Sequence, residues 1–139
     1  MKFLSLALPV FLACTSTSAI RVSYDNTYDS SSGSLSTVAC SDGSNGLLTK
    51  GFTTFGSLPH FPNIGGAQAV ASWNSPNCGS CWNLTFKGTS ISVLAVDHAD
   101  SGFNIAQAAM DKLTKNQAVA LGAIDATATQ VSKSVCGLH

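Results

Sequence analysis

Alternation of apolar and polar side chains predicts most of the β structure in this chain. Trp82–Lys87 alternates along its length, Gly88–Thr89 supplies a turn, and Ile91–Val96 resumes the extended pattern. Two such runs joined by a short glycine-containing turn predict a β-hairpin. Val22–Tyr24 and Ala123–Val131 alternate in the same way. We therefore expect a strand just after residue 20 and a closing strand near the C-terminal end.

One segment, Asn104–Lys115, has a helical period instead. Ile105, Ala109 and Leu113 recur every four residues, a spacing that places them on one face of a helix. Asn104 would stand at the first turn, where an asparagine side chain can accept a backbone N–H and cap the helix. The pattern predicts one helix over this segment.

The remaining segments are rich in turn-forming residues. Residues 29–36, 40–46 and 60–66 are dense in Ser, Gly, Asn or Pro and predict irregular structure. Val70–Trp73 is a short apolar run, and we expect Trp73 in the core, although an exposed indole there would make a stacking surface. Many short strands, Gly-rich connections and one helix favour a small barrel or closed sheet.

The first residues predict export. Met1-Lys2 gives a positive start, Phe3–Cys14 is apolar apart from Ser5 and Pro9, and small residues precede Ala19. This pattern is typical of a secretory signal over residues 1–19 and is too short for a membrane-spanning helix. Residues 20–139 would remain, and 139 − 19 = 120 residues suffice for a single domain with its own core.

Charge excludes two classes of partner. Without Lys2 the chain carries six Lys and Arg against seven Asp and no Glu, so its net charge is 6 − 7 = −1. Neither nucleic acid nor an anionic membrane would gain from so balanced a surface. A neutral partner fits the composition better.

The motif Cys78-Gly-Ser-Cys-Trp82 has two reactive interpretations, and both fail. It spells the sequence around the nucleophile of papain-like proteases, whose His and Asn lie about 130–150 residues downstream. Only 139 − 81 = 58 residues follow Cys81. A disulfide-exchange site is disfavoured because no thioredoxin-like βαβ pattern surrounds the motif.

A structural role for the cysteines needs no further assumption. Loss of the signal removes Cys14 and leaves an even set of four: Cys40, Cys78, Cys81 and Cys136. In an oxidising compartment four cysteines predict two disulfides, with three pairings open. We expect no metal site, because His60 and His98 show no ligand spacing to the cysteines, and no cofactor.

Asn83-Leu84-Thr85 is a candidate N-glycosylation sequon. It lies within a predicted strand, with the Asn83 side chain expected to point outward. An unmodified polar residue on that face is the alternative.

Several short motifs occur in a fixed order along the chain. They are Val22-Ser-Tyr-Asp25, Val38-Ala-Cys-Ser41, Phe61-Pro-Asn-Ile-Gly-Gly66, Cys78-Gly-Ser-Cys-Trp82, Val96-Asp97, Gly102-Phe-Asn-Ile105 and Cys136. This ordered set resembles the cerato-platanin family of small secreted fungal proteins and spans essentially all of residues 20–139.

The resemblance implies a fold. The expected structure is mainly β with one or two short helices, a six-stranded double-psi β-barrel related to that of expansins and some cellulases. The resemblance also implies the disulfides Cys40–Cys78 and Cys81–Cys136, a choice that spacing left open. Trp82 would then pack beside the disulfides as part of the core.

The same resemblance implies a site. In the expansin and cellulase relatives an Asp stands in a His-Phe-Asp motif, and the matching position here is Asn104. Glycoside hydrolysis needs two carboxyl groups, one of them a proton donor, and an amide cannot serve as that acid. Asp97 would be the remaining carboxylate, while Asp100 and Asp111 are interpreted as a loop acid and a solvated helix acid. We expect no enzymatic activity.

The implied function is binding of chitin-type oligomers of N-acetylglucosamine and of cell-wall polysaccharide. Asp97 and Asn104 would hydrogen-bond the sugar, with Tyr24 and Asp25 as weaker candidates. Each has a structural alternative: Asn104 as a helix cap alone, Asp97 as a brace for a loop, and Tyr24 as a core residue with a tethered hydroxyl.

Family membership would place the protein outside the cell and in the fungal wall. A monomer is expected, with an elicitor role that involves a plant host receptor. Loosening of cellulose without hydrolysis, as in expansins, and surface-active self-assembly are the alternatives.

Overall fold

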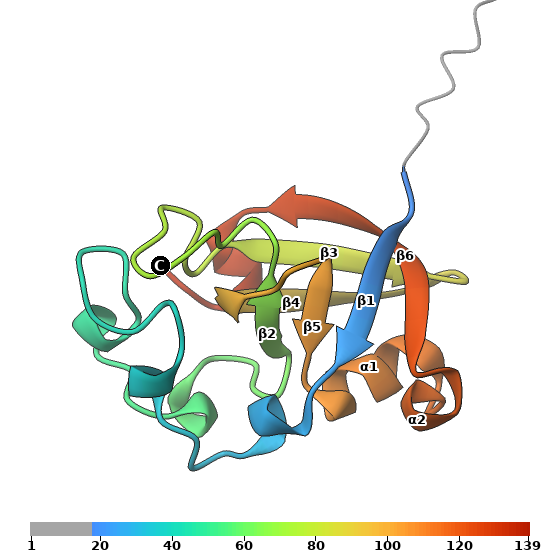
Figure 1. Cartoon of the computed structure of the whole chain (residues 1–139), viewed down its shortest axis with the longest axis horizontal. Coiled ribbons are helices and arrows are strands. Elements are labelled where there is room, and N and C mark those ends of the chain that lie inside the picture. Colours follow the sequence, from blue (N-terminus) through green and yellow to red (C-terminus); the bar gives the residue numbers. More distant parts are fainter. Residues whose placement is uncertain (1–17) are drawn as a thin grey trace, which may run out of the picture.

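Six short strands close into a barrel in the computed structural model, which describes residues 18–139. The strands are β1 (Ile20–Tyr24), β2 (Ile64–Ala67), β3 (Cys81–Phe86), β4 (Thr89–His98), β5 (Phe103–Ile105) and β6 (Ala123–Val131). The helices α1 (Gln107–Thr114) and α2 (Ala118–Leu121) lie at one end of the barrel, and long loops with short helical turns lie at the other (Figure 1). The secretory signal predicted over residues 1–19 falls almost entirely outside the described residues.

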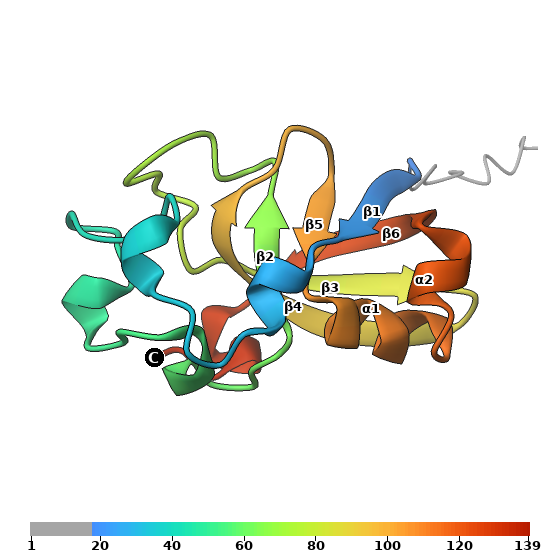
Figure 2. The same ribbon diagram turned by 60° about the horizontal axis from the view of Figure 1, so that its bottom comes forward.

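The order around the barrel is β1-β5-β2-β4-β3-β6, with β6 returning to β1. Two neighbouring pairs, β1–β5 and β2–β4, are parallel, and the others are antiparallel. Parallel neighbours require crossover connections, so segments far apart in sequence meet in the centre. Figure 2 shows β2, β5 and β1 side by side. The predicted mainly β, six-stranded double-psi barrel is confirmed.

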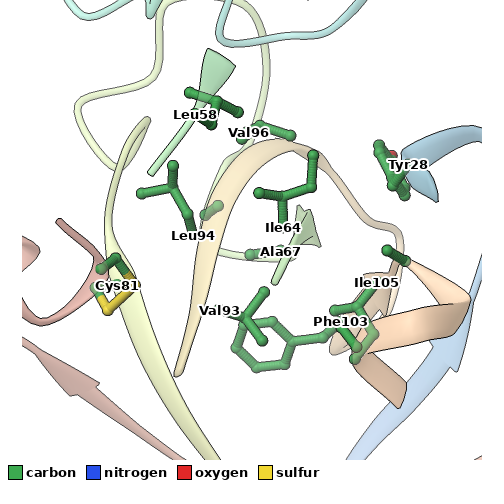
Figure 3. Close-up of a cluster of buried hydrophobic side chains, with 14 of the residues drawn as sticks. Tyr28, Leu58, Ile64, Ala67, Cys81, Val93, Leu94, Val96, Phe103 and Ile105 are labelled. Carbon is green, nitrogen blue, oxygen red and sulfur yellow. A yellow bond between two sulfur atoms is a disulfide. The ribbon is translucent and has the colours of Figure 1, made fainter. Parts of the chain in front are cut away.

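The barrel is filled by aliphatic and aromatic side chains from β2, β4 and β5 (Figure 3). Ile64, Leu94 and Ile105 are fully buried, and Phe103 is 3% exposed. Burial of each such side chain stabilises the fold by roughly 1.5–3 kcal/mol. Side chains from these three strands therefore share one core.

Two disulfides link the barrel to the segments around it. Cys40 is bonded to Cys78 and Cys81 to Cys136, with S–S distances of 2.08 and 2.02 Å. The predicted pairing is therefore confirmed. Cys78 lies in the turn before β3 and Cys81 is the first residue of β3, so this short segment is joined to both the N-terminal and the C-terminal parts of the chain. In this structure the motif is a cross-link.

The predicted hairpin and closing strand are confirmed as β3–β4 and β6. The irregular interpretation of residues 60–66 was wrong at its end, because Ile64–Ala67 forms β2. All four residues of β2 are buried, so no polar alternation marks the strand. Gly65 and Gly66 serve close packing: a Cβ at Gly65 would lie 2.5 Å from the Ile105 Cα.

The predicted helix begins too early. α1 starts at Gln107, and Asn104 lies within β5, where it pairs with Ser23 and Gly66. Asn104 therefore does not cap the helix. Barrel pairing of Phe103–Ile105 outweighs the local helical period, because both edges of β5 are hydrogen-bonded to neighbouring strands.

The two tryptophans differ from their expected burial. Trp73 was expected in the core but is 57% exposed. Trp82 is partly buried and packs edge-on against Phe103 with ring centroids 5.5 Å apart. No helix within residues 18–139 has the length and apolar composition needed to cross a membrane.

Candidate functional site

Strand register places Asp97 and Asn104 on either side of one glycine. Gly66 of β2 pairs with Asn104 of β5 along one edge and with Asp97 of β4 along the other. Ser23 of β1 pairs with Asn104 in turn. The four residues form a row across four strands. Adjacent strands are about 4.8 Å apart, so the Asp97 and Asn104 backbones are separated by roughly 10 Å.

Gly66 keeps the centre of this row free of side-chain atoms. A Cβ at Gly66 would lie 2.7 Å from the carbonyl oxygen of His98, a contact that backbone atoms cannot relieve. The close approach of β2 to the end of β4 therefore requires glycine. As a result, only backbone atoms lie between the Asp97 carboxylate and the Asn104 amide in this row.

Asp97 is occupied by hydrogen bonds from the protein. Its Oδ2 accepts from the Tyr28 hydroxyl at 2.8 Å, and its Oδ1 accepts from the backbone N–H groups of Ala39 and His98 at 3.0 and 2.9 Å. A carboxylate has about four acceptor positions, so three of them are filled. The structure agrees with the interpretation of Asp97 as a brace for the segment that contains Tyr28 and Ala39.

Tyr28 is a buried partner that the sequence did not single out. Burial, followed by the hydrogen bond to Asp97, raises the pKa of the Tyr28 hydroxyl far above its ordinary value. The hydroxyl therefore remains a donor to Asp97 at any physiological pH. No local pattern around Tyr28 announces this contact, because its partner lies 69 residues away.

Asn104 is much less occupied. Its Oδ1 accepts from the Ser23 hydroxyl at 2.9 Å. Among residues 18–139 no acceptor receives a hydrogen bond from the Asn104 Nδ2 amide. Asn104 is half-buried, so this side chain offers two N–H donors beside Gly66, held in orientation by Ser23.

Tyr24 and Asp25 do not join the row. Successive side chains of a strand point to opposite faces, and Ser23 shares a face with Asn104, so Tyr24 points the other way and packs against the core. Asp25 accepts the N–H of Thr27 at 2.8 Å and begins a short helical turn over Asn26–Asp29. Tyr24 and Asp25 therefore support the structure at the end of β1.

Asp29 is a second residue that local sequence patterns missed. Its two carboxylate oxygens accept the N–H groups of Gln107 and Ala108 at 2.8 and 2.9 Å. Asp29 thus caps the first turn of α1 from 78 residues away in the chain. A negative charge at this end also complements the helix dipole. This long-range cap replaces the local cap expected from Asn104.

His98 joins the end of β4 to the loop after β2. Its Nδ1 lies 2.7 Å from the Val70 carbonyl, and its Nε2 lies 2.9 Å from Asp100. The carbonyl of Val70, and next the carboxylate of Asp100, raise the pKa of His98. Only the protonated ring donates from both nitrogens, so the protonated form makes both contacts at once.

Two further predictions concern modification and metals. Asn83 lies on β3 and is half-buried, and its Oδ1 accepts a hydrogen bond from the Thr85 hydroxyl at 3.3 Å; glycosylation there stays a prediction. Within residues 18–139 no group of three His, Cys, Asp or Glu side chains is arranged to hold a metal ion.

Comparisons with known proteins agree with the motifs and the fold. A family model described as cerato-platanin matches residues 20–138. A heat-stable 19 kDa antigen of Coccidioides immitis is 46% identical over 138 residues, which cover 96% of this chain and 94% of the antigen. The crystal structure of cerato-platanin 2 from M. perniciosa matches with a TM-score of 0.82 and 54% identity, over 86% of this chain and 99% of that one. The solution structure of the fungal elicitor cerato-platanin matches with a TM-score of 0.74 and 37% identity, over 84% of this chain and 96% of that one. This chain belongs to the cerato-platanin family.

Proposed function

We propose that this protein is a secreted carbohydrate-binding protein that recognises N-acetylglucosamine oligomers and related wall polysaccharide without cleaving them. The observation that carries the proposal is the row of Ser23, Asn104, Gly66 and Asp97. Sugars present hydroxyl and acetamide groups, which are neutral donors and acceptors. Asn104 supplies two N–H donors, the Gly66 backbone allows close approach, and Asp97 retains acceptor capacity.

The same row lacks the parts needed for hydrolysis. Glycosidic cleavage requires one carboxyl group to donate a proton to the leaving oxygen and a second to act as base or nucleophile. By the resemblance to expansins and cellulases, Asn104 occupies the position of their Asp, and here the oxygens of Asp97 accept hydrogen bonds from Tyr28, Ala39 and His98. These two features support a site that binds sugar without turnover.

Calorimetric titration with the N-acetylglucosamine tetramer tests this function. Wild type should bind, and N104A should lose at least about tenfold in affinity, since removal of hydrogen bonds worth roughly 1.4 kcal/mol produces that change. Ser23→Ala removes the hydrogen bond that orients the amide but keeps its two N–H donors, so it should lose less affinity than N104A. No reducing sugar should be released. Absence of binding by folded wild type, or cleavage of the tetramer into shorter oligomers, contradicts the proposal.

An elicitor role is the biological consequence that family membership supports, since one solved relative is described as a fungal elicitor. The protein would act outside the cell, at the fungal wall or against a plant host receptor, as a monomer. Treating plant cells with wild type and N104A separates two routes. A defence response that survives loss of sugar binding assigns elicitation to a protein receptor.

Surface-active self-assembly is a second candidate, favoured by the exposed side of α2. Val119 and Leu121 are 66% and 41% exposed within this single short helix. The two side chains leave different faces of the helix, and together they expose apolar surface of the kind that interaction sites use. Replacing both with Ser should abolish surface activity and leave sugar binding unchanged. Loosening of cellulose is tested separately, by weakening of filter paper without sugar release.

A further inference from the structure

Trp73 is an exposed aromatic side chain that the site described above does not use. It lies in the loop between β2 and β3, and 57% of its surface is exposed. The other tryptophan of the chain, Trp82, has its indole N–H bound to Ser80 and packs against Phe103. Trp73 therefore presents its indole at the surface, whereas Trp82 lies against the core.

The Trp73 indole is fixed in position rather than free to rotate. Its Nε1 donates to Asp42 Oδ1 at 2.7 Å. Gly43 lies directly against the ring, since a Cβ at that position would be 3.1 Å from Trp73 Cζ2. Next along the loop, Asn74 accepts two hydrogen bonds from Asn45, at 2.8 and 3.0 Å. One segment, residues 42–45, lies 29 to 31 residues earlier in the chain and holds one side of the loop while the indole remains exposed.

A continuous path of contacts connects this tryptophan to Asp97. The N–H of Ala39 donates to Asp97 Oδ1 at 3.0 Å, and the carbonyl of Ala39 accepts the N–H of Asn74 at 3.2 Å. The next residue after Ala39 is bonded to the same loop through the disulfide Cys40–Cys78. One residue and two hydrogen bonds therefore separate the loop of Trp73 from the row that contains Asp97 and Asn104.

Asp42 adds a polar group beside the exposed ring. Its Oδ1 receives the Trp73 indole N–H and, at 3.3 Å, the Ser41 hydroxyl. Within residues 18–139 no donor is bound to Asp42 Oδ2. A flat apolar surface with a carboxylate oxygen at its edge matches a pyranose ring, which has C–H groups on its face and hydroxyls around its rim.

We propose that Trp73 and Asp42 form a second carbohydrate subsite. The indole stacks on the face of an equatorially substituted pyranose, and Asp42 Oδ2 accepts a hydrogen bond from one of its hydroxyls. This subsite rests on the proposed carbohydrate-binding function and extends it: short oligomers occupy the row at Asn104, and longer ones also reach Trp73. The protein would then select for chain length as well as for sugar type.

Titration with the N-acetylglucosamine dimer and hexamer tests the subsite. Trp73→Ala should lower hexamer affinity by about tenfold, the change expected for loss of one aromatic contact, and leave dimer affinity unchanged. Trp73→Tyr, which keeps an aromatic face, should restore most of the hexamer affinity. Asn104→Ala should weaken both oligomers. Circular dichroism and the unfolding midpoint establish that each variant is folded.

Tryptophan fluorescence provides an independent signal, because the chain has only two tryptophans. Hexamer should change the emission of wild type and of Trp82→Phe, but not that of Trp73→Phe. Equal hexamer affinity in wild type and Trp73→Ala, alongside weakened binding in Asn104→Ala, overturns the subsite and leaves the proposed function standing. Failure of wild type to bind either oligomer overturns both.

Discussion

Asp97 and Asn104, the two polar residues that flank Gly66, differ in how many hydrogen bonds they make within the protein. Asp97 accepts three hydrogen bonds from Tyr28, Ala39 and His98. Asn104 accepts one, from Ser23, and its amide donors have no acceptor among residues 18–139. Both residues lie in one row and were predicted as equal partners of a sugar. The Asp97 side connects the loops to the barrel, and the Asn104 side is available to a ligand.

Two polar residues in the same row of strands can therefore have different roles. A polar group whose hydrogen bonds are already made by the protein stabilises the fold, and breaking them costs free energy. A polar group held by one bond and otherwise open can exchange water for ligand at little cost. Substitutions on the Asp97 side should therefore reduce stability, whereas substitutions on the Asn104 side should reduce affinity.

The largest effect is expected at Asp97. Asp97→Ala leaves the buried Tyr28 hydroxyl and the N–H groups of Ala39 and His98 without their acceptor. Each unsatisfied donor costs roughly 1–3 kcal/mol when it is fully buried. Because the three donors to Asp97 are only partly buried, we expect a total loss of about 3 kcal/mol in the free energy of unfolding. Urea unfolding measures the change.

The control for this prediction is Asp125→Ala. Asp125 is exposed on β6, and such surface substitutions usually change stability by no more than about 0.5 kcal/mol. A similar midpoint for both variants would show that Asp97 is not a brace.

The next effect in size concerns the cap of α1. Asp29→Ala removes the acceptor of the Gln107 and Ala108 N–H groups and should destabilise the protein by about 1–2 kcal/mol. Asp29→Asn keeps one acceptor oxygen and loses the charge, so its cost should be smaller. If both variants unfold like wild type, the long-range cap contributes nothing to stability.

Asn104 should matter little for stability. Asn104→Ala and Ser23→Ala remove the same hydrogen bond, so each should cost about 1 kcal/mol or less. Thermal unfolding of the two variants measures this. A loss at Asn104 much larger than at Ser23 would mean that the amide is part of the framework, which would remove the contrast with Asp97.

The smallest effect is a pH dependence at His98. Its pKa is raised by the Val70 carbonyl and by Asp100, with Asp97 a further nearby carboxylate. The protonated ring is therefore favoured in the folded state. This stabilisation is fully present below the unfolded pKa of about 6.5 and is lost as pH rises through the folded pKa.

The test is the unfolding midpoint from pH 5 to pH 9 for wild type and His98→Gln. His60 and His139 remain in both proteins, so the difference isolates His98. Wild type should lose stability relative to the variant as pH rises. Parallel curves would contradict this contribution.

The pattern of apolar and polar residues predicted β3, β4 and β6 but missed β2 and β5. β3 and β6 mix buried positions with half-buried or exposed ones, so alternation helps to reveal them. β4 is buried throughout Val93–Val96, and the turn at Gly88–Thr89 marks it as the second strand of the hairpin. β2 is buried throughout and β5 is three residues long, so neither has a period to detect. β2 can pair with β5 and with β4 only because Gly65 and Gly66 have no side chains. The requirement for glycine comes from strands that are distant in sequence, so the local sequence does not show it.

The candidate site follows the same division. The resemblance to a family named Asp97 and Asn104, but only strand register explains why they flank Gly66. Tyr28 and Asp29 contact partners 69 and 78 residues away, which no window of sequence could reveal. The exposure of Trp73 depends on the turn at Asp42 and Gly43, which occupies the space beside its ring.

The central claim is that the Asn104 amide binds sugar while the donors to Asp97 stay in place. NMR titration with the N-acetylglucosamine tetramer observes both sets of N–H groups in one experiment. The account predicts that the Asn104 side-chain amide signals shift with ligand concentration, and that the Ala39 and His98 backbone N–H signals move little. Large shifts at Ala39 and His98 with none at Asn104, or no shifts at all, would contradict it.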